Sequence, residues 1–504
     1  MILLELMFQE YELIGRERVW AGVYAGEHTA DVIVSDSYPD VDRIIETFGQ
    51  ILIEEVRMGT DGANLEGKLQ GGILFGDEKG EVHSLPLSIP FSARKELTIE
   101  GDDHALCYHC VLRSVDARAV NSRKLLVRIG FQWNIEIYKP LSRKIRYLDE
   151  PTERLQLKQR EYPIRIPTAT GEKRFTVNEE LELPESCPPI GEMLKFCSRM
   201  QIMEQKAVGG KGVFKMELLI HLLYEDPRGK LCTYEWRIPL SQYGDLSDDT
   251  QDGDLQTILH YTELDLEPDS YVESHRLFLR AGFHAQFMVY EVRNLRLIED
   301  AFCTDAILEP TWQQWQCRPL LDCRTMSATA RRSNVENIGT PIDLWARAGE
   351  LQIEQKGETA VIKVPVACTV LSYDGEGKLR GEQICLTAEG ELPMSADSEC
   401  CIRDIVCTDV YCSMASGSAE IRVPVQLTAD CYGMQAFRSL HGGELLPIPE
   451  CGERKPSVIL RRTEGNEDLW SIAKSYRTTV EGIRRANDLE EGTVPHGTML
   501  LIPL

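Results

Sequence analysis

The octapeptide LWSIAKSY at residues 469–476 decides how the last fifty residues of the chain fold. Its apolar residues recur at positions i, i+3, i+4 and i+7, a spacing that places them on one face of a helix. Gly465 stands just before this stretch, as expected of a turn that leads into a helix. The sequence therefore predicts an amphipathic helix over residues 469–476.

A second helix and two short strands complete the pattern. Thr478 followed by Glu481 is a capping-box spacing, which predicts a helix that runs to about Asn487. Its inward-facing residues are expected to be Val480, Ile483 and Ala486. The apolar runs at 458–460 and 499–503 have the character of strands. Strand, helix, helix and strand in this order predict a two-stranded sheet covered by a helix pair.

This pattern resembles the LysM module, in which a glycine-led turn enters L-W-x-I-A, a second helix reads T-x-x-x-(L or I)-x-x-x-N and the module ends on L-x-I-P. The chain matches these features at residues 469–473, 479–487 and 500–503. The resemblance implies a groove for an N-acetylglucosamine chain or a protein partner, between the turn before the first helix and the loop after the second. Its residues in this sequence would be Asn466, Glu467, Asp468, Leu469, Asp488, Leu489 and Glu490.

One departure from the family pattern bears on this groove. The usual G-D-T-L-W is one residue longer here and has no threonine, so acidic side chains stand where a hydroxyl would donate to a sugar. Whether the groove takes a glycan, a protein or both therefore stays open. Trp470 is expected to pack in the core of the module.

The composition of the chain argues against several classes of protein. At 504 residues, the length allows about three to four domains. The net charge of −25 argues against nucleic acid, whose phosphates need a basic face. No run of eighteen or more apolar residues exists, so no transmembrane helix is expected. Because residues 1–12 lack a basic segment and a cleavage site, we expect the protein to stay in the cytosol.

The sixteen cysteines are expected to be reduced thiols. Most stand within apolar runs, where a thiol acts as a small hydrophobe. Cys107 and Cys110 have the C-x-x-C spacing, but no second such pair completes a tetrahedral zinc site, so packing is the favoured interpretation. Four cysteines between residues 400 and 412 have no histidine nearby and are weaker metal candidates. The sequence therefore predicts no metal site.

An internal repeat organises the rest of the chain. Strand-like runs flank a turn three times, and the turn glycines Gly80, Gly229 and Gly377 are separated by 149 and 148 residues. A constant period indicates a repeated domain. The first two copies are expected to contain a short helical stretch, at 44–45 and at 193–194. We interpret 1–150, 151–300 and 301–440 as three mostly β domains, 441–456 as a linker and 457–504 as the small C-terminal module.

The repeats also resemble a known domain. A central hairpin, an I-P-F or I-P-L ending (89–91 and 238–240) and a late R-x-G-F strand (128–131, with R-A-G-F at 280–283) are similar to the SPOCS domain of endospore-forming bacteria. The third copy is the most divergent. Three such repeats followed by one LysM module resemble the SipL type of spore-coat morphogenetic protein. The expected fold is therefore mostly β: tandem β-rich SPOCS-like domains plus a small α+β (βααβ) LysM module.

The resemblance implies a non-enzymatic scaffold in endospore coat assembly. Its LysM module would bind the stage IV A coat morphogenetic ATPase, and its SPOCS repeats would contact further coat proteins. The protein would act in the cytoplasm on the mother-cell side of the forespore surface, in the spore coat. The alternative is a cell-wall protein that binds peptidoglycan through N-acetylglucosamine, which would need export. A third alternative is that the β repeats carry a ligand site of their own.

No motif of an enzyme or of a cofactor site is present. The sequence lacks the patterns G-x-x-x-x-G-K-S/T, H-E-x-x-H and G-x-S-x-G. The histidines are dispersed, and we expect surface or structural roles for His83, His104 and His109. The carboxylate pairs at 54–55 and 179–180 are expected to be solvated charge, not a catalytic pair. We therefore predict no catalytic residue, no bound cofactor and no enzyme activity.

Overall fold

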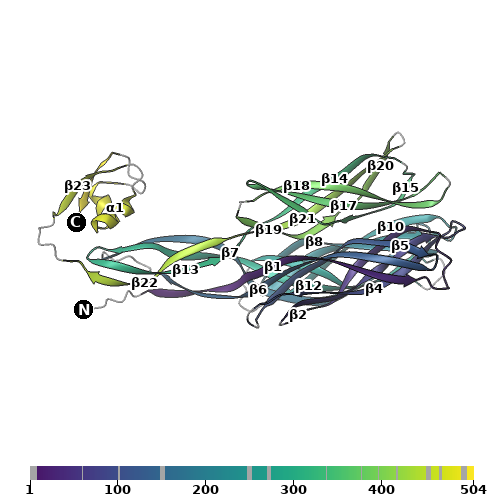
Figure 1. The fold of residues 1–504 in the computed structure, drawn as a ribbon, viewed down its shortest axis with the longest axis horizontal. Helices are drawn as coiled ribbons and strands as arrows, with labels where there is room; N and C mark the ends of the chain where they lie inside the picture. Colours follow the sequence, from purple (N-terminus) through teal and green to yellow (C-terminus); the bar gives the residue numbers. More distant parts are fainter. Residues whose placement is uncertain are drawn as a thin grey trace.

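The computed structural model describes residues 8–59, 61–99, 101, 103–147, 154–246, 253–269, 274–336, 338–375, 377–394, 397–415, 418–449, 456–464, 468–489 and 497–504. Figure 1 shows long strands gathered into sandwiches at one end of the molecule, with strand pairs that continue from them as a narrower arm. The small C-terminal module lies near the far end of this arm. Every strand pair among the described residues is antiparallel.

The first copy of the repeat is a sandwich of two three-stranded sheets. Its strands are β1 (Gln9–Ile33), β2 (Arg43–Gly59), β3 (Gly62–Gly76), β4 (Val82–Glu96), β5 (Ala105–Asn121) and β6 (Lys124–Tyr147). One sheet has the order β1-β6-β5 and the other the order β2-β3-β4. Side chains alternate between buried and exposed along most of β4, as expected for a strand with one face on a core.

The second copy repeats this topology. Its strands are β7 (Leu155–Glu182), β8 (Glu192–Val208), β9 (Lys211–Glu225), β10 (Leu231–Asp245), β11 (Asp254–Pro268) and β12 (Arg276–Cys303). The sheet orders β7-β12-β11 and β8-β9-β10 correspond position by position to those of the first copy. An apolar core fills each sandwich, with the buried Trp133 in the first and the buried Phe283 in the second.

The third copy has the same two layers, but its strands are divided. They are β13 (Ala306–Cys317), β14 (Leu320–Val335), β15 (Pro341–Ala348), β16 (Gln352–Lys356), β17 (Thr359–Tyr373), β18 (Leu379–Pro393), β19 (Ser398–Cys407), β20 (Tyr411–Ala415), β21 (Ser418–Gly433) and β22 (Gln435–Pro447). One sheet contains β14, β21, β19 and β20, the other β15, β16, β17 and β18, and β13 pairs with β22. The break between β13 and β14 falls at Pro319, whose nitrogen cannot donate to a ladder.

The predicted hairpin turns are present in all three copies. They open on Asp77, Asp226 and Asp374, and the N–H of the turn glycine donates to the carbonyl of this aspartate at 2.9–3.0 Å. The φ angles of Gly80, Gly229 and Gly377 are +88°, +80° and +76°. Glycine adopts this left-handed region without strain, which explains why the period of the repeat is readable from glycines.

The short helical stretches predicted at 44–45 and 193–194 are wrong, because both lie in strands, β2 and β8. A β-bulge falls at this place in every copy, at Ile45, Leu194 and Ile342, where the strand shifts its register against its neighbour. A bulge re-aims the side chains around it. Two adjacent residues are therefore buried, such as Leu194 and Lys195, and strict alternation is lost.

The residues that follow the bulges meet in a buried ion cluster. Lys195 Nζ lies 2.7 Å from Glu46 Oε2 and 2.7 Å from Asp343 Oδ2. These residues come from β2, β8 and β15 and are 149 and 148 residues apart, the same intervals as the turn glycines. They are therefore equivalent positions of the three copies, which converge on one axis of the molecule.

His221 of β9 completes this axial ion cluster. Its Nε2 contacts Asp343 Oδ1, and its Nδ1 lies 3.0 Å from Glu235 Oε1. Burial acts to lower the pKa of His221, but the two carboxylates outweigh burial and raise this pKa to about 9. Burial acts to raise the pKa of Asp343, but Lys195 and His221 outweigh it and hold this pKa well below its ordinary value. Opposite charges therefore balance one another inside the protein.

The ends of the long strands form the arm. The strand pairs β1–β6, β7–β12 and β13–β22 each extend beyond their sandwich, and their apolar side chains pack together as one core. The core of the arm contains Leu13, Leu141, Ile145, Ile164, Ile166, Leu295, Leu297, Trp315, Cys317 and Phe437. All three copies therefore contribute to one continuous body.

The predicted fold class, mostly β with tandem β-rich domains and a small α+β module, is confirmed. The domain limits at 150, 300 and 440 stay a prediction. β12 continues to Cys303 and β22 continues to Pro447, so the segment expected to be a linker from residue 441 begins inside a strand.

Lys195→Ala is expected to destabilise the protein by about 3–5 kcal/mol, because it leaves the buried Glu46 without its partner and Asp343 with His221 alone. The free energy of unfolding in urea measures this effect. Lys215→Ala is the matched control, since the Lys215–Glu204 pair is exposed and such pairs contribute about 0–1 kcal/mol. Equal losses in the two variants would contradict the role of the cluster.

His221 is expected to make stability depend on pH. Its pKa is about 9 in the folded protein, against about 6.5 in an unfolded chain. Because the folded value is higher, the stabilisation is fully present below pH 6.5 and is lost as the pH rises through 9. The difference in unfolding free energy between the wild type and His221→Gln should therefore shrink by about 3 kcal/mol over this interval. A difference that stays constant with pH would exclude this linkage.

Candidate functional site

The C-terminal module has the predicted order of elements. They are β23 (Val458–Arg462), α1 (Leu469–Tyr476), α2 (Val480–Ala486) and β24 (Met499–Pro503), with β23 and β24 antiparallel. Leu469, Ile472 and Ala473 of α1 are buried, as their spacing predicted. The helix pair and the two-stranded sheet share one small apolar core.

The second helix begins one residue later than its capping pattern predicted. Thr479 is the N-cap, and its hydroxyl accepts a hydrogen bond from Gly482 N at 2.9 Å. Thr478 is instead buried, and its N–H donates to Ala473 O at 3.0 Å, which closes the end of α1. The capping box predicted from Thr478 and Glu481 is therefore wrong, because the turn between the helices needs one more residue.

The inward face of α2 is narrower than predicted. Of the three residues expected there, Ile483 is buried, Val480 is half-buried and Ala486 is exposed. Asn487 fixes the end of the helix to β24: its Nδ2 donates to Leu501 O at 2.6 Å, and its Oδ1 accepts from Leu501 N at 2.6 Å. Because an amide side chain both donates and accepts, asparagine can complete a strand edge in this way.

The predicted groove residues fall at the ends of the two helices. Asn466, Glu467 and Glu490 lie outside the described residues. Asp468 is the N-cap of α1, and its carboxylate accepts from Ser471 N at 2.8 Å, a bond that lowers the pKa of Asp468. This carboxylate therefore has a structural role whether or not it contacts a ligand.

The remaining groove residues differ in what they can offer a ligand. Leu469 is buried, and the half-buried Leu489 packs on the same core, so the structure brings these two together. Asp488 is exposed and has a φ of +49°, in the left-handed region that aspartate and asparagine tolerate. Among the described groove residues, a partner can therefore reach Asp488, the half-buried Leu489 and the carboxylate of Asp468, whose side chain is 47% exposed.

The first helix of the module docks on the second repeat, near the end of the arm. Asp300 of β12 accepts from Trp470 Nε1 at 2.8 Å and lies 2.6 Å from Lys474 Nζ. Burial acts to raise the pKa of Asp300, but Lys474 and Trp470 outweigh it and lower this pKa. Lys158 of β7 lies 3.5 Å from the Asp468 carboxylate. The docking contact therefore reaches one edge of the predicted groove.

Trp470 packs against the apolar core of the module, as predicted, but it is only partly buried there. Its indole is half-buried and meets the ring of Phe302 edge to face, with ring centroids 5.0 Å apart. Phe302 itself is buried and joins the apolar core of the module. Trp470 therefore connects the module to the arm, a role that the local sequence pattern could not reveal because its partners are about 170 residues away.

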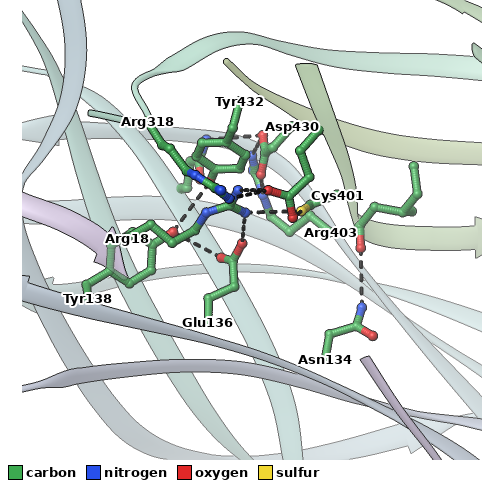
Figure 2. A network of polar contacts seen from close by, with 12 residues as sticks. Arg18, Asn134, Glu136, Tyr138, Arg318, Cys401, Arg403, Asp430 and Tyr432 are labelled. Carbon is green, nitrogen blue, oxygen red and sulfur yellow. Dashed lines mark hydrogen bonds and ion pairs between the residues drawn. The ribbon is translucent and has the colours of Figure 1, made fainter. Parts of the chain in front are cut away.

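A second polar network gathers where the arm meets the sandwiches (Figure 2). The hydroxyls of Tyr138, Tyr290 and Tyr432, at equivalent positions of the three copies, lie 3.0–3.4 Å from one another. Arg18 lies 3.6 Å from the centroid of the Tyr432 ring and 2.9 Å from Glu136 Oε1. These three tyrosines, called the tyrosine ring below, thus join the three repeats at one level, and the axial ion cluster joins them at another.

The other side chains considered as metal or catalytic candidates have structural surroundings. Cys107 and Cys110 are buried free thiols, and burial raises the pKa of each. The His109 ring packs 5.9 Å from that of His260, and burial lowers the pKa of His109. Glu54, Glu179 and Glu180 are exposed, and Glu55 is half-buried.

Within the described part of the chain, one group has ligand atoms close enough to hold a metal ion. Asp77, Glu81 and His83 have one such atom each within 4.8 Å of the others, at the first hairpin turn. Asp77 Oδ1, however, accepts from Lys79 N and Glu81 N, at 3.0 and 2.8 Å. Such bonds to the backbone are typical of an aspartate at the start of a turn. The group is thus accounted for by the hairpin.

Comparison with known families identifies both domain types expected from the sequence. The model described as SipL, SPOCS domain, matches residues 40–118, and the LysM domain model matches residues 466–503. The first match spans β2 to β5 up to residue 118, and the same strand order recurs in the second copy. No curated protein and no solved structure matches the chain.

The chain therefore carries a SPOCS domain of the SipL type and a C-terminal LysM domain, as predicted. Both are non-catalytic binding domains, and together they fit a sporulation-related protein that binds other proteins or peptidoglycan. Among the described residues, neither helix has the length or the hydropathy that a membrane crossing needs.

Asp300→Ala is expected to release the LysM module from the arm, because it removes the acceptor of both Trp470 and Lys474. Small-angle scattering of the full chain should show a larger radius of gyration, and the tryptophan emission should shift to the red. Asp305→Ala is the matched control, since its pair with Arg154 is exposed. Unchanged scattering in Asp300→Ala would mean that other contacts suffice to hold the module.

Proposed function

We propose that this protein is a non-enzymatic scaffold of endospore coat assembly. Its LysM domain binds the stage IV A coat morphogenetic ATPase, and its three SPOCS-like repeats contact further coat proteins on the mother-cell side of the forespore surface. The observation that carries this proposal is the occurrence of a SipL-type SPOCS domain and a LysM domain in one chain.

The architecture supports a scaffold in physical terms. The repeats form one body through the axial ion cluster, the tyrosine ring and the shared core of the arm. The LysM domain is docked on this body through Asp300 and not only tethered by the chain. A partner captured by the LysM domain would thus be held in a defined position relative to the repeats.

The chemistry of the groove favours a protein over a glycan. Four of the seven predicted groove residues are acidic: Glu467, Asp468, Asp488 and Glu490. Carboxylates cannot donate the hydrogen bond that the missing threonine would offer to a sugar, whereas they complement a basic protein surface. The described acidic residues stand at the two helix ends that frame the groove.

Peptidoglycan binding is the alternative function, since LysM domains bind N-acetylglucosamine chains as well as proteins. The two functions share the same groove and differ in the partner that is retained. Incubation of the full chain with purified ATPase and, separately, with insoluble peptidoglycan distinguishes them. Retention by peptidoglycan alone would overturn the scaffold proposal.

The double change Glu467→Gln and Asp488→Asn is expected to weaken capture of the ATPase about tenfold, equivalent to about 1.4 kcal/mol, because it removes two groove charges without a change in size. Asparagine tolerates the left-handed backbone at 488, so circular dichroism should stay native. The dissociation constant is measured by surface plasmon resonance. Glu481→Gln, which is exposed on α2 and outside the predicted groove, should bind like the wild type. Unchanged affinity of the double variant would place the contact elsewhere.

A further inference from the structure

A cavity of about 190 Å³ lies where the three repeats converge, with walls from all three copies. The residues that come after Lys195 in β8 and after Asp343 in β15 line this cavity, together with Arg403 of the third copy. The cavity therefore lies inside the scaffold, far along the chain from the LysM groove. A cavity of this size has room for several water molecules or a small ion.

The charge of the lining is opposite to that of the protein. The chain has a net charge of −25, yet the described residues that line the cavity include four arginines and one aspartate, Asp404, with no lysine or glutamate. Arg403 is neutralised by Asp430, whose carboxylate accepts from Nε and from the terminal NH2 of this arginine. The remaining three arginines are Arg113, Arg199 and Arg347.

These three arginines contact mainly neutral acceptors. Arg113 donates to Gln132 Oε1 at 3.1 Å and to Ala348 O at 3.5 Å, and Arg347 donates to Gly49 O at 3.2 Å. Within the described part of the chain, no carboxylate oxygen lies within ion-pair distance of either guanidinium. Each guanidinium has five N–H donors, so most donors of Arg113 and Arg347 stay free for a ligand.

Arg199 is partly compensated. It donates to the carbonyls of Cys407 and Thr408, the latter at 3.1 Å, and Asp409 Oδ1 lies 3.7 Å from its NH2. Other carboxylates act on the three arginines from farther away: Glu350 on Arg113, Glu235 on Arg199, and Glu46 and Asp116 on Arg347. Among the described residues, only Asp409 lies within ion-pair distance of any of the three, so Arg113 and Arg347 have no direct carboxylate partner.

The three guanidiniums act on one point of the lining. The thiol of Cys407 in β19 is buried, and burial raises its pKa to about 12, while Arg199, Arg347 and Arg113 each oppose this rise. Arg199 donates to the carbonyl of Cys407, and Arg113 donates to the carbonyl of Ala348, the residue next to Arg347. The three arginines, one from each repeat, therefore line the same cavity as Cys407.

The pKa of these three arginines is shifted in the opposite direction from the pKa of the paired Arg403. Burial lowers the pKa of Arg113 to about 10 and lowers the pKa of Arg199 and of Arg347. For Arg403 burial acts in the same direction, but Asp430 outweighs it and the pKa is raised. A buried cation without sufficient negative charge is costly, and an added anion would remove this cost.

We propose that this cavity is a binding site for a compact oxyanion, such as inorganic phosphate, held by Arg113, Arg199 and Arg347. The planar fork of a guanidinium matches the oxygen pairs of phosphate and sulfate. Because each repeat supplies one arginine, the bound anion joins the three repeats at a third point, in addition to the axial ion cluster and the tyrosine ring. The site belongs to the SPOCS-like repeats and does not depend on the ligand of the LysM domain.

The test uses the full chain in a chloride buffer titrated with inorganic phosphate at constant ionic strength. We expect saturable heat of binding at one site and a melting temperature that rises with phosphate but not with added chloride. Arg347→Gln and Arg113→Gln should each weaken phosphate binding at least tenfold. Arg94→Gln is the matched control, since Arg94 is exposed on β4 and is not part of the cavity lining, and this variant should bind phosphate like the wild type.

Stability in the absence of phosphate separates the proposal from a purely structural role of the arginines. If the cations await an anion, Arg113→Gln in chloride should melt at or above the temperature of the wild type, and phosphate should stabilise only the wild type. If Arg113 serves only to hold Gln132 and Ala348, the variant should melt lower by the same amount in both salts. That result, or a wild type that does not respond to phosphate, would overturn the proposal.

Discussion

The architecture depends on one lysine buried between two carboxylates. Three homologous repeats that converge on an axis bring the same position of each copy together, and three identical charges there would repel one another at close range. Glu46, Lys195 and Asp343 occupy these equivalent positions with mixed signs, so the cluster is attractive. A single chain with three copies can differentiate such positions, whereas an assembly of three identical chains cannot.

In the tyrosine ring, by contrast, the equivalent positions of the three copies hold the same neutral residue. Tyr138, Tyr290 and Tyr432 are identical, and because a hydroxyl both donates and accepts, the three satisfy one another around an axis without a charge. Burial raises the pKa of all three, which keeps them neutral. Equivalent positions on the axis therefore diverge where the side chain is charged and stay the same where it is a neutral donor and acceptor.

Local features were predictable from the sequence, and features set by distant contacts were not. The turn glycines, the apolar face of α1 and the closing strand β24 follow from short-range spacing. The bulges at Ile45 and Leu194 were mistaken for helix because each puts two adjacent residues on buried sides of the strand. The local sequence cannot reveal this, since one of the two buried sides faces the other repeats. The contacts of Trp470 with Asp300 and Phe302 could not be predicted, because these residues are about 170 positions away in the sequence. Of the groove, the positions of Asp468, Leu469, Asp488 and Leu489 are now known, and their role as a binding surface remains a prediction.

The docking of the LysM domain links its groove to the repeats. Lys158 lies 3.5 Å from the carboxylate of Asp468, a predicted groove residue, and Asp300 contacts the same helix one turn further on. A partner that engages Asp468 must share this carboxylate with Lys158 or displace the lysine. If binding of the partner weakens or strengthens the docking of the LysM domain on the arm, docking changes the affinity for the partner by the same free energy. Docking on the arm therefore contributes to the affinity of the LysM domain for its partner. A LysM domain separated from the repeats would bind the partner with a different affinity from the one in the intact chain.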